Sequence, residues 1–206
     1  MTMLPLVLKL SNRPVLVVGA GRVGVGKARL LMESGARVTM IAPEHVHELP
    51  AGLATFHRRA YQPGDLLGFM LVVSATGDAH VNDLVVSEAR DRGIWINVVD
   101  DPERSDYFFT AVHRSGDVVL SVSTEGASPA LAREIRDRIS ESLPDNLADI
   151  ADQLRSMRQR LHDSGLSTEG VDWRPIMRRL IDHPSAPRAT DCIVGRAASQ
   201  ETTLTT

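Results

Sequence analysis

Three glycines near the start of the chain have the spacing of a phosphate-binding turn. They stand in the run GAGRVG (19–24), which starts at the last residue of the apolar run 14–19 and leads into a helical pattern over 22–34. Gly19 is expected to allow the tight turn, Gly21 to let the backbone approach a diphosphate, and Gly24 to let helix and strand pack closely. Free N–H groups at the start of a helix bind anions. The spacing predicts a bound dinucleotide, and the alternative is a glycine turn without a ligand.

The ribose contact of this dinucleotide is less regular. An acidic residue is expected about 20 positions further on, at the end of the second strand. Here the apolar run 37–42 is followed by Pro43 and then by Glu44, so the acid is displaced past a proline. Glu44 is either a ribose ligand or a solvated loop carboxylate. No arginine stands there to bind a 2′-phosphate, which favours NAD over NADP.

Two polar segments follow later strands, at the edge where open α/β sheets bind ligands. Thr76 lies in a small-residue segment that suits close approach to the nicotinamide half of the cofactor. Asn97 and Asp100 follow the next strand. A carboxylate beside a nicotinamide is a natural general base, which takes a proton while hydride leaves the same substrate. The alternative for Asp100 is a turn or capping role.

Strands alternate with helices through the first half of the chain, which predicts a Rossmann-type parallel sheet in an α/β fold. Lys27 is expected on the solvent side of the first helix. The expected strands are 14–19, 37–42, 54–58, 69–75 and 94–99, and the expected helices are 22–34, ended by Gly35, and 79–92, ended by Gly93.

After residue 100 the pattern changes to a small α+β region and then to helices. Ser128 is expected to cap a helix that has Pro129 at its first position. The final stretch, 184–206, lacks periodicity and is predicted to be a disordered tail. The expected elements are a hairpin of strands 107–112 and 118–123 with its turn at 113–117, and helices over 128–142, 145–163 and 169–182.

Composition excludes several other classes of protein. The 206 residues carry a net charge of −3 and only 4% aromatic side chains, so nucleic acid and anionic membranes are not expected partners. The single cysteine, Cys192, excludes a disulfide framework and any multi-cysteine metal site. His45 and His47 are interpreted as solvated loop residues rather than metal ligands. No apolar run approaches the ~18 residues of a membrane span, and we expect a soluble, cytoplasmic protein.

Taken together, these motifs resemble the precorrin-2 dehydrogenase family, which includes the N-terminal part of bacterial sirohaem synthase and the yeast bifunctional dehydrogenase/chelatase. The similarity runs from about Leu4 to about Leu161. Its most specific pieces are the NVVD run that ends at Asp100 and the STEGASP run that ends at Pro129. Other matching pieces are the glycine turn, KARLL from position 27, GARVT from position 35, Ala42-Pro43 and Ala75-Thr76.

The resemblance implies NAD-dependent oxidation of precorrin-2 to sirohydrochlorin in the sirohaem or cobalamin branch of tetrapyrrole synthesis. Asp100 matches the family's catalytic aspartate. The family's nucleotide contacts map to Arg22, Val23, Pro43 and Glu44, which accounts for the missing acid at the strand end. Some members also insert metal into sirohydrochlorin, so Fe(II) or Co(II) would be a further substrate. The sequence shows no separate metal site.

The resemblance also implies a homodimer, formed through the region after the Rossmann domain. It leads us to expect four parts in the chain. They are an NAD-binding Rossmann domain over 1–106, a dimerisation region over 107–144, a helical domain over 145–183 and the tail over 184–206.

Candidate substrate contacts come from the same resemblance and from charge. Precorrin-2 is a polycarboxylate, so its cleft should offer cationic or N–H donors. The candidates are Thr124, Ser128 and Arg133. The alternative role of Ser128 is a helix cap, and that of Arg133 is a place on a solvated helix surface. Glu125 departs from the family by placing a carboxylate in a loop that is usually small or neutral. The cations in the matching region are Arg104, Arg133, Arg136 and Arg138.

One hypothesis of another class remains open: an NAD-sensing regulatory dimer without catalysis. Rossmann domains do act in this way, and a fold alone does not determine function. A sensor of this kind would bind NAD without oxidising precorrin-2. It would not need the segment from Asn97 to Asp100.

Overall fold

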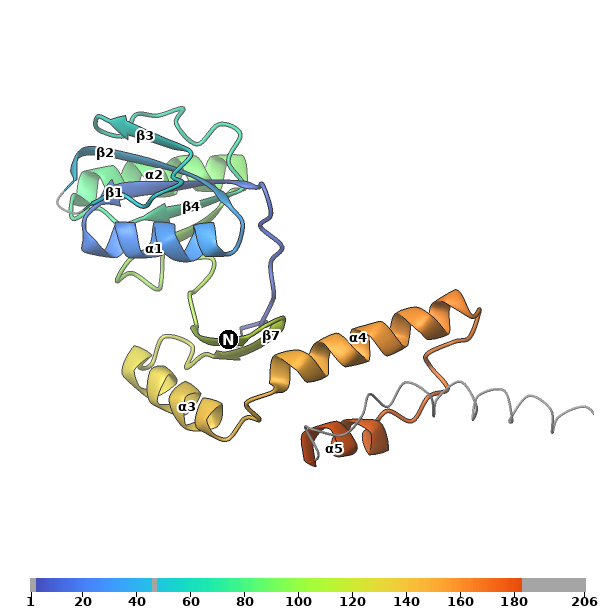
Figure 1. The fold of residues 1–206 in the computed structure, drawn as a ribbon. Coiled ribbons are helices and arrows are strands. Elements are labelled where there is room, and N and C mark those ends of the chain that lie inside the picture. Colours follow the sequence, from blue (N-terminus) through green and yellow to red (C-terminus); the bar gives the residue numbers. More distant parts are fainter. Residues whose placement is uncertain (1–2, 46–47, 183–206) are drawn as a thin grey trace, which may run out of the picture. The chain divides into compact units, whose positions relative to one another are not determined.

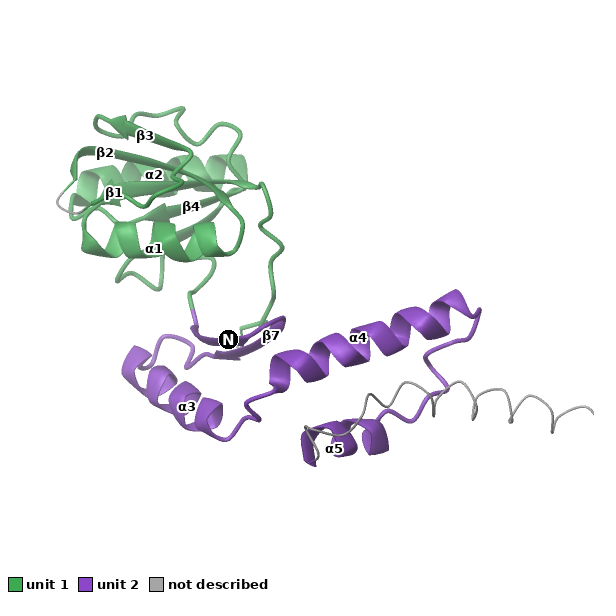
Figure 2. Cartoon of the chain, in the orientation of Figure 1, with its two compact units in different colours: residues 1–109 green, residues 110–206 purple. Residues whose placement is uncertain are grey.

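The computed structural model describes residues 3–45 and 48–182 (Figure 1). His47, Cys192 and the tail predicted over 184–206 lie outside the described residues. The chain divides into two compact units, Met1–Phe109 and Thr110–Thr206 (Figure 2).

The first unit is built on a parallel five-stranded sheet in the order β3-β2-β1-β4-β5. The chain therefore moves outward on one side of β1 and then returns to build the other side. This reversal lies between β1 and β4, and open α/β sheets bind ligands outside the carboxyl ends of the strands at such a point. The strands are β1 (Pro14–Ala20), β2 (Arg37–His45), β3 (Thr55–Arg58), β4 (Leu71–Ser74) and β5 (Trp95–Val98).

Two helices cover opposite faces of this sheet, α1 (Arg22–Glu33) and α2 (Ala79–Arg92) (Figure 1). Successive side chains of a strand point to opposite faces, and β1 is apolar on both. Val15 and Val17 belong to the cluster that packs on α1, whereas Leu16 and Val18 belong to the cluster that packs on α2. The predicted Rossmann-type fold is confirmed.

The end of β2 differs from the prediction that Pro43 closes this strand. The strand continues to His45, because its pairing with β1 shifts register after Val18 and resumes with Ala20 opposite His45. Pro43 lies within the irregular stretch, where a residue without an N–H is tolerated. The bulge brings the end of β2 beside the glycine turn that follows β1.

The second unit contains an antiparallel hairpin and three helices. Its hairpin strands are β6 (Ala111–Ser115) and β7 (Val118–Val122), and its helices are α3 (Pro129–Glu141), α4 (Leu147–Asp163) and α5 (Arg174–Asp182). Helix α3 packs on both strands. Ser128 caps α3 as predicted, with its Oγ accepting from the N–H of Leu131 at 3.2 Å.

Three boundaries predicted in this half of the chain are wrong by three residues or more. The first hairpin strand begins at Ala111 rather than at 107, because Tyr107 and Phe109 pack on the core of the first unit. The strand then runs on to Ser115, so the connection shrinks to two residues. Helix α5 begins at Arg174 rather than at 169, after a loop in which the indole N–H of Trp173 donates to the carbonyl of Thr168.

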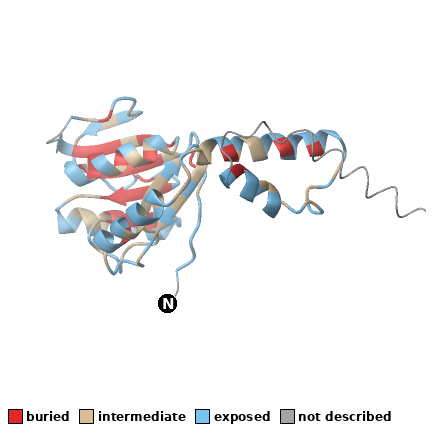
Figure 3. Cartoon of the chain, turned by 60° about the horizontal axis from the view of Figure 1, so that its bottom comes forward, coloured by how far each residue is buried: buried red, intermediate tan, exposed pale blue. Residues whose placement is uncertain are grey.

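Burial differs between the two units. In Figure 3 the buried positions of the first unit follow the strands and the helix sides that face them. The described part of the second unit has five buried apolar side chains, and it leaves Leu131 51% and Val119 40% exposed. The buried residues are Ala132, Ile150, Met157, Leu161 and Leu180.

A buried carboxylate ties α2 to the loop after β3. Glu88 is 9% exposed and accepts from the Tyr61 hydroxyl at 2.5 Å and from the Gly64 N–H at 2.8 Å. Arg92 lies 2.7 Å from its other oxygen. Burial by itself raises the pKa of Glu88, but these hydrogen bonds outweigh burial and hold its pKa below the ordinary value of 4.5.

This carboxylate should make the fold acid-sensitive. Because its pKa is lowered by folding, its stabilisation is complete above pH 4.5 and is lost as the pH falls through the lower folded value. We expect Glu88→Gln to lower the free energy of unfolding at pH 7 by about 1–3 kcal/mol and to reduce the loss of stability below pH 4.5. Urea unfolding at several pH values measures both. Exposed Glu33→Gln is the control; equal effects of the two substitutions would contradict the assignment.

Candidate dinucleotide and substrate site

The glycine turn is close-packed on one side and open on the other. Gly19 has φ +102°, and a Cβ there would lie 2.4 Å from the carbonyl oxygen of Ala75. A Cβ on Gly24 would lie 2.2 Å from the carbonyl oxygen of Gly19. A Cβ on Gly21, by contrast, would meet nothing within 4 Å. Gly19 and Gly24 therefore allow β1, α1 and the loop after β4 to approach closely, and Gly21 leaves the outer side accessible to a ligand.

The first turn of α1 is suited to binding an anion. Gly21 precedes the helix in an extended conformation, and no side chain of the described residues caps the first turn. Arg22 and Val23 are exposed there. The exposed pair Pro43 and Glu44 lies in the bulge of β2, which the pairing of β1 and β2 places beside this turn. The sequence-predicted nucleotide contacts thus gather at one edge of the sheet.

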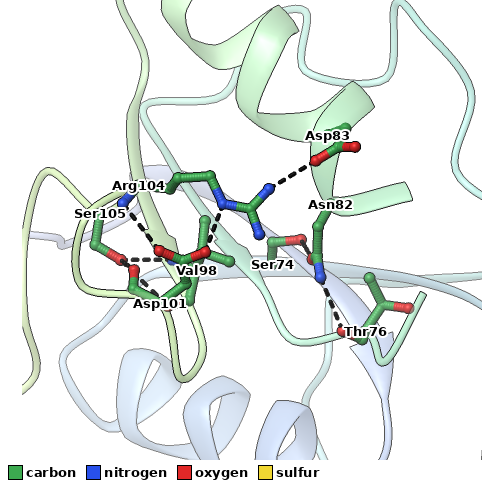
Figure 4. Close-up of polar contacts among 8 residues, drawn as sticks. All are labelled: Ser74, Thr76, Asn82, Asp83, Val98, Asp101, Arg104 and Ser105. Atoms are coloured by element: carbon green, nitrogen blue, oxygen red, sulfur yellow. Dashed lines mark hydrogen bonds and ion pairs between the residues drawn. The ribbon is translucent and has the colours of Figure 1, made fainter. Parts of the chain in front are cut away.

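A partly buried hydrogen-bond network shapes the loop after β4 (Figure 4). Ser74 is 1% exposed and its hydroxyl lies 2.6 Å from Oδ1 of Asn82 in α2. The amide nitrogen of Asn82 donates in turn to the carbonyl of Thr76 at 3.2 Å. The network holds Ala75 in place against Gly19. Sequence reasoning missed Asn82; its signal is a polar residue one turn into a helix that follows a ligand-side loop.

Thr76 and Asp78 complete this loop. The Thr76 hydroxyl accepts from the N–H of Asp78 at 3.2 Å, and Asp78 caps α2 by accepting from the N–H groups of His80 and Val81. Both polar groups of Thr76 thus help to shape the loop. Its contact with the nicotinamide half of the cofactor stays a prediction, which its position at the carboxyl end of β4 supports.

The loop after β5 is closed at its base. Asn97 is 7% exposed and its amide donates to the carbonyl of Tyr107 at 2.9 Å. The N–H of Asp106 donates to the carbonyl of Ile96 at 2.8 Å, and the N–H of Ile96 donates to the carboxylate of Asp106 at 3.0 Å. Asn97 therefore has a structural role, and its predicted contact with the cofactor remains a prediction.

A second set of contacts fixes the interior of this loop (Figure 4). Arg104 lies 2.5 Å from Asp101 and 2.7 Å from Asp83 of α2, so it joins the loop to the helix. The hydrogen bond from Arg104 holds the pKa of Asp101 below its usual range. The hydroxyl of Ser105 accepts from the N–H of Val98 at 2.9 Å. Arg104, a candidate substrate cation in the sequence, is thus engaged by two carboxylates.

Asp100 stands at the tip of the closed loop. It is exposed and has φ +61°, a left-handed conformation that aspartate tolerates better than most residues. Its neighbour Asp101 forms an isolated bridge with Val98. The left-handed turn therefore leaves the carboxylate of Asp100 exposed at the carboxyl edge of the sheet. A turn role for Asp100 is thus compatible with the predicted catalytic role.

Lys27 differs most from its predicted place on the solvent side of α1. Its side chain is half-buried, and its Nζ lies 3.9 Å from the centroid of the Phe109 ring. Burial lowers the pKa of Lys27, while the negative charge of Asp100 opposes this effect. Sequence pattern gave no signal for the contact, because its partner lies far along the chain.

The candidate substrate residues lie in the second unit. The Thr124 hydroxyl accepts from the N–H of Ser128 and donates to its carbonyl, both at 3.1 Å, and so orders the loop before α3. In α3, Arg136 pairs with Asp137 and Arg138 with Glu134. Arg133 is exposed and has no ion pair within the described ranges. Of these three arginines, it is the one whose guanidinium is not already paired with a carboxylate of the described residues.

In residues 3–45 and 48–182, no group of three or more histidine, cysteine or acidic side chains is placed to hold a metal ion. Nor does this part of the chain include a helix long and apolar enough to cross a membrane.

A five-stranded parallel sheet with a glycine turn at its reversal point defines a dinucleotide-binding domain of the Rossmann type. Residues 6–111 match the family described as "Putative NAD(P)-binding", and residues 120–142 match the family described as "Sirohaem biosynthesis protein central". The chain belongs to this NAD(P)-binding family.

Its relatives include enzymes of sirohaem synthesis. Siroheme synthase 2 of Aeromonas hydrophila is 39% identical over 170 residues, which cover 80% of this chain and 36% of that protein. Siroheme synthase of Methylococcus capsulatus is 36% identical over 208 residues, which cover 99% of this chain and 43% of that protein. The chain thus spans less than half the length of these relatives.

A solved structure shows the same fold. It is described as SirC, precorrin-2 dehydrogenase, and superposes with a TM-score of 0.64 at 23% sequence identity. The superposition covers 97% of this chain and 98% of that one.

Proposed function

We propose that this chain oxidises precorrin-2 to sirohydrochlorin, with NAD as the hydride acceptor. The observation that carries the proposal is the presence in one chain of a dinucleotide turn, an aspartate loop at the same sheet edge and a sirohaem-specific central segment. The names of the relatives, siroheme synthase and precorrin-2 dehydrogenase, supply the substrate. An enzyme of this pathway would act in the cytoplasm.

The residues at the sheet edge fit a bound nicotinamide dinucleotide. NAD supplies the acceptor for the hydride that leaves the substrate. The N–H groups at the start of α1, from Arg22 to Gly24, would bind the diphosphate. The bulge of β2 would contact the ribose, and the carboxylate of Glu44 would repel a 2′-phosphate, so we propose NAD rather than NADP.

Asp100 is the proposed general base. The closed loop after β5 holds it at the carboxyl edge, where it would accept a proton from the macrocycle as hydride leaves. Thr124, Ser128 and Arg133 are the proposed substrate contacts. Arg133 supports this most directly, because its guanidinium is available for a substrate carboxylate.

A homodimer formed through residues 107–144 is the proposed assembly. Leu131 on α3 and Val119 on β7 are 51% and 40% exposed in the single chain, and a second copy would cover such side chains. We also propose the four-part division of the chain that the family resemblance implies. Sedimentation of the purified protein tests the dimer directly.

An anaerobic assay tests the reaction. Protein given precorrin-2 and NAD should produce NADH and sirohydrochlorin in equal amounts, and NADP should replace NAD poorly. NAD binding without oxidation would instead indicate the regulatory dimer. Adding Fe(II) or Co(II) to the same cuvette then shows whether metal insertion exceeds the uncatalysed rate.

A further inference from the structure

Lysine is rare in this chain. It occurs at positions 9 and 27 only, and every other permanently cationic side chain is an arginine. Lys9 is exposed, whereas Lys27 is half-buried on α1. The two lysines therefore form a natural pair, one in the candidate site and one outside it.

The surroundings of Lys27 leave its charge only partly compensated. Its ammonium packs on the ring of Phe109 at 3.9 Å, and Asp100 is the charged group whose field acts on it. No carboxylate forms an ion pair with Lys27 within 4.0 Å in the described part of the chain. Burial of a cation is unfavourable unless it is paired. The lowered pKa of Lys27 reflects the same partial loss of water.

The position of Lys27 separates it from the expected diphosphate site. It lies five residues after Arg22, which corresponds to about 7.5 Å along the axis of α1. The ring on which it packs, Phe109, and the carboxylate whose charge acts on it, Asp100, both come from the chain after β5 and not from the glycine turn. Lys27 thus belongs to the part of the site that holds the proposed base.

We propose that Lys27 binds a carboxylate of the tetrapyrrole substrate beside Asp100. This inference rests on the proposed function. A polycarboxylate macrocycle presents anionic groups around its rim, and a lysine ammonium binds one of them as a point charge. Anchoring the rim at Lys27 fixes the macrocycle relative to the Asp100 carboxylate, while the ring of Phe109 keeps the ammonium in place.

The rarity of lysine allows a direct test by NMR. Reductive methylation with ¹³C-formaldehyde labels Lys9, Lys27 and the N-terminal amine, and Lys27→Arg assigns the signal. Sirohydrochlorin should shift the Lys27 signal and raise its pKa, and should leave Lys9 unchanged. A Lys27 signal that responds to NAD and not to sirohydrochlorin would overturn the proposal in favour of a diphosphate contact. So would a signal that responds to neither.

Kinetics supply the second test. We expect Lys27→Met to raise the KM for precorrin-2 at least about tenfold, because one charge-assisted hydrogen bond is lost. The KM for NAD should not change. Lys27→Arg should recover most of the loss, and Lys9→Met should have no effect. An unchanged KM for precorrin-2, or a change confined to NAD, overturns the proposal.

These tests remain distinct from the test of the proposed function. Failure of the wild-type protein to oxidise precorrin-2 would remove the function, whereas the NMR titration uses the product and requires no turnover. If Lys27→Met does not fold, the titration of the wild-type protein with sirohydrochlorin still decides.

Discussion

Replacing Asp100 by asparagine should reduce precorrin-2 oxidation at least about 100-fold, the usual contribution of a general base. Asparagine retains the size of aspartate and tolerates the left-handed conformation at φ +61°, so the loop should keep its shape. Binding of NAD, measured by calorimetry, should not change. The variant therefore separates the chemistry of the carboxylate from the structure of its loop.

Asp100→Ala makes the comparison stricter. Alanine in the left-handed region is disfavoured by roughly 1–2 kcal/mol, so this variant should lose both activity and some stability. Equal loss of turnover in the two variants, with a lower melting temperature in the alanine variant alone, fits a catalytic carboxylate. If the asparagine variant keeps more than a tenth of wild-type turnover, Asp100 is not the base.

Substitution of Gly24 by alanine should damage both the fold and the nucleotide site. The new Cβ would lie 2.2 Å from the carbonyl oxygen of Gly19, so α1 must move away from β1. Overpacking of this kind costs about 1–3 kcal/mol. Because the start of α1 supplies the proposed diphosphate contacts, we also expect NAD to bind at least about tenfold more weakly, as when one charge-assisted hydrogen bond is lost.

Gly26 provides the matched control on the same helix. A Cβ there would meet nothing within 4 Å, and the position is exposed. Alanine should therefore stabilise the protein by roughly 0.5–1 kcal/mol, its usual advantage over glycine inside a helix. Thermal unfolding and NAD titration of both variants test the prediction. Equal stability of the two variants would contradict the close packing of Gly24 in α1 against Gly19 of β1.

Much of the first unit could be predicted from local pattern. The glycine turn, the apolar runs and the alternation of strands with helices determine a Rossmann-type sheet, because each signal depends on residues close together in the chain. The strand over 107–112 was a wrong prediction for the opposite reason. Its consecutive aromatic residues at 107–109 are typical of a strand, but Tyr107 and Phe109 are held by the core of the first unit.

The candidate site was predictable in its residue types more than in its contacts. Asp100 follows a strand and carries a recognisable motif, so it could be found. Lys27 could not be, because helical periodicity assigns it to solvent and its partner Phe109 lies 82 positions later. Asn82 was missed for a different reason: its partners are close in the sequence, but its role depends on where the loop from Ser74 to Thr76 passes.

The closed base of the loop after β5 has a consequence for how activity responds to heat. Asn97 and Tyr107 fasten this loop to the last strand of the sheet, so Asp100 gains its conformation when the first unit folds and not when substrate arrives. A base prepared in this way needs no rearrangement during turnover. Heating should therefore not disorder the Asp100 loop before the first unit itself unfolds, and loss of the base should coincide with that unfolding.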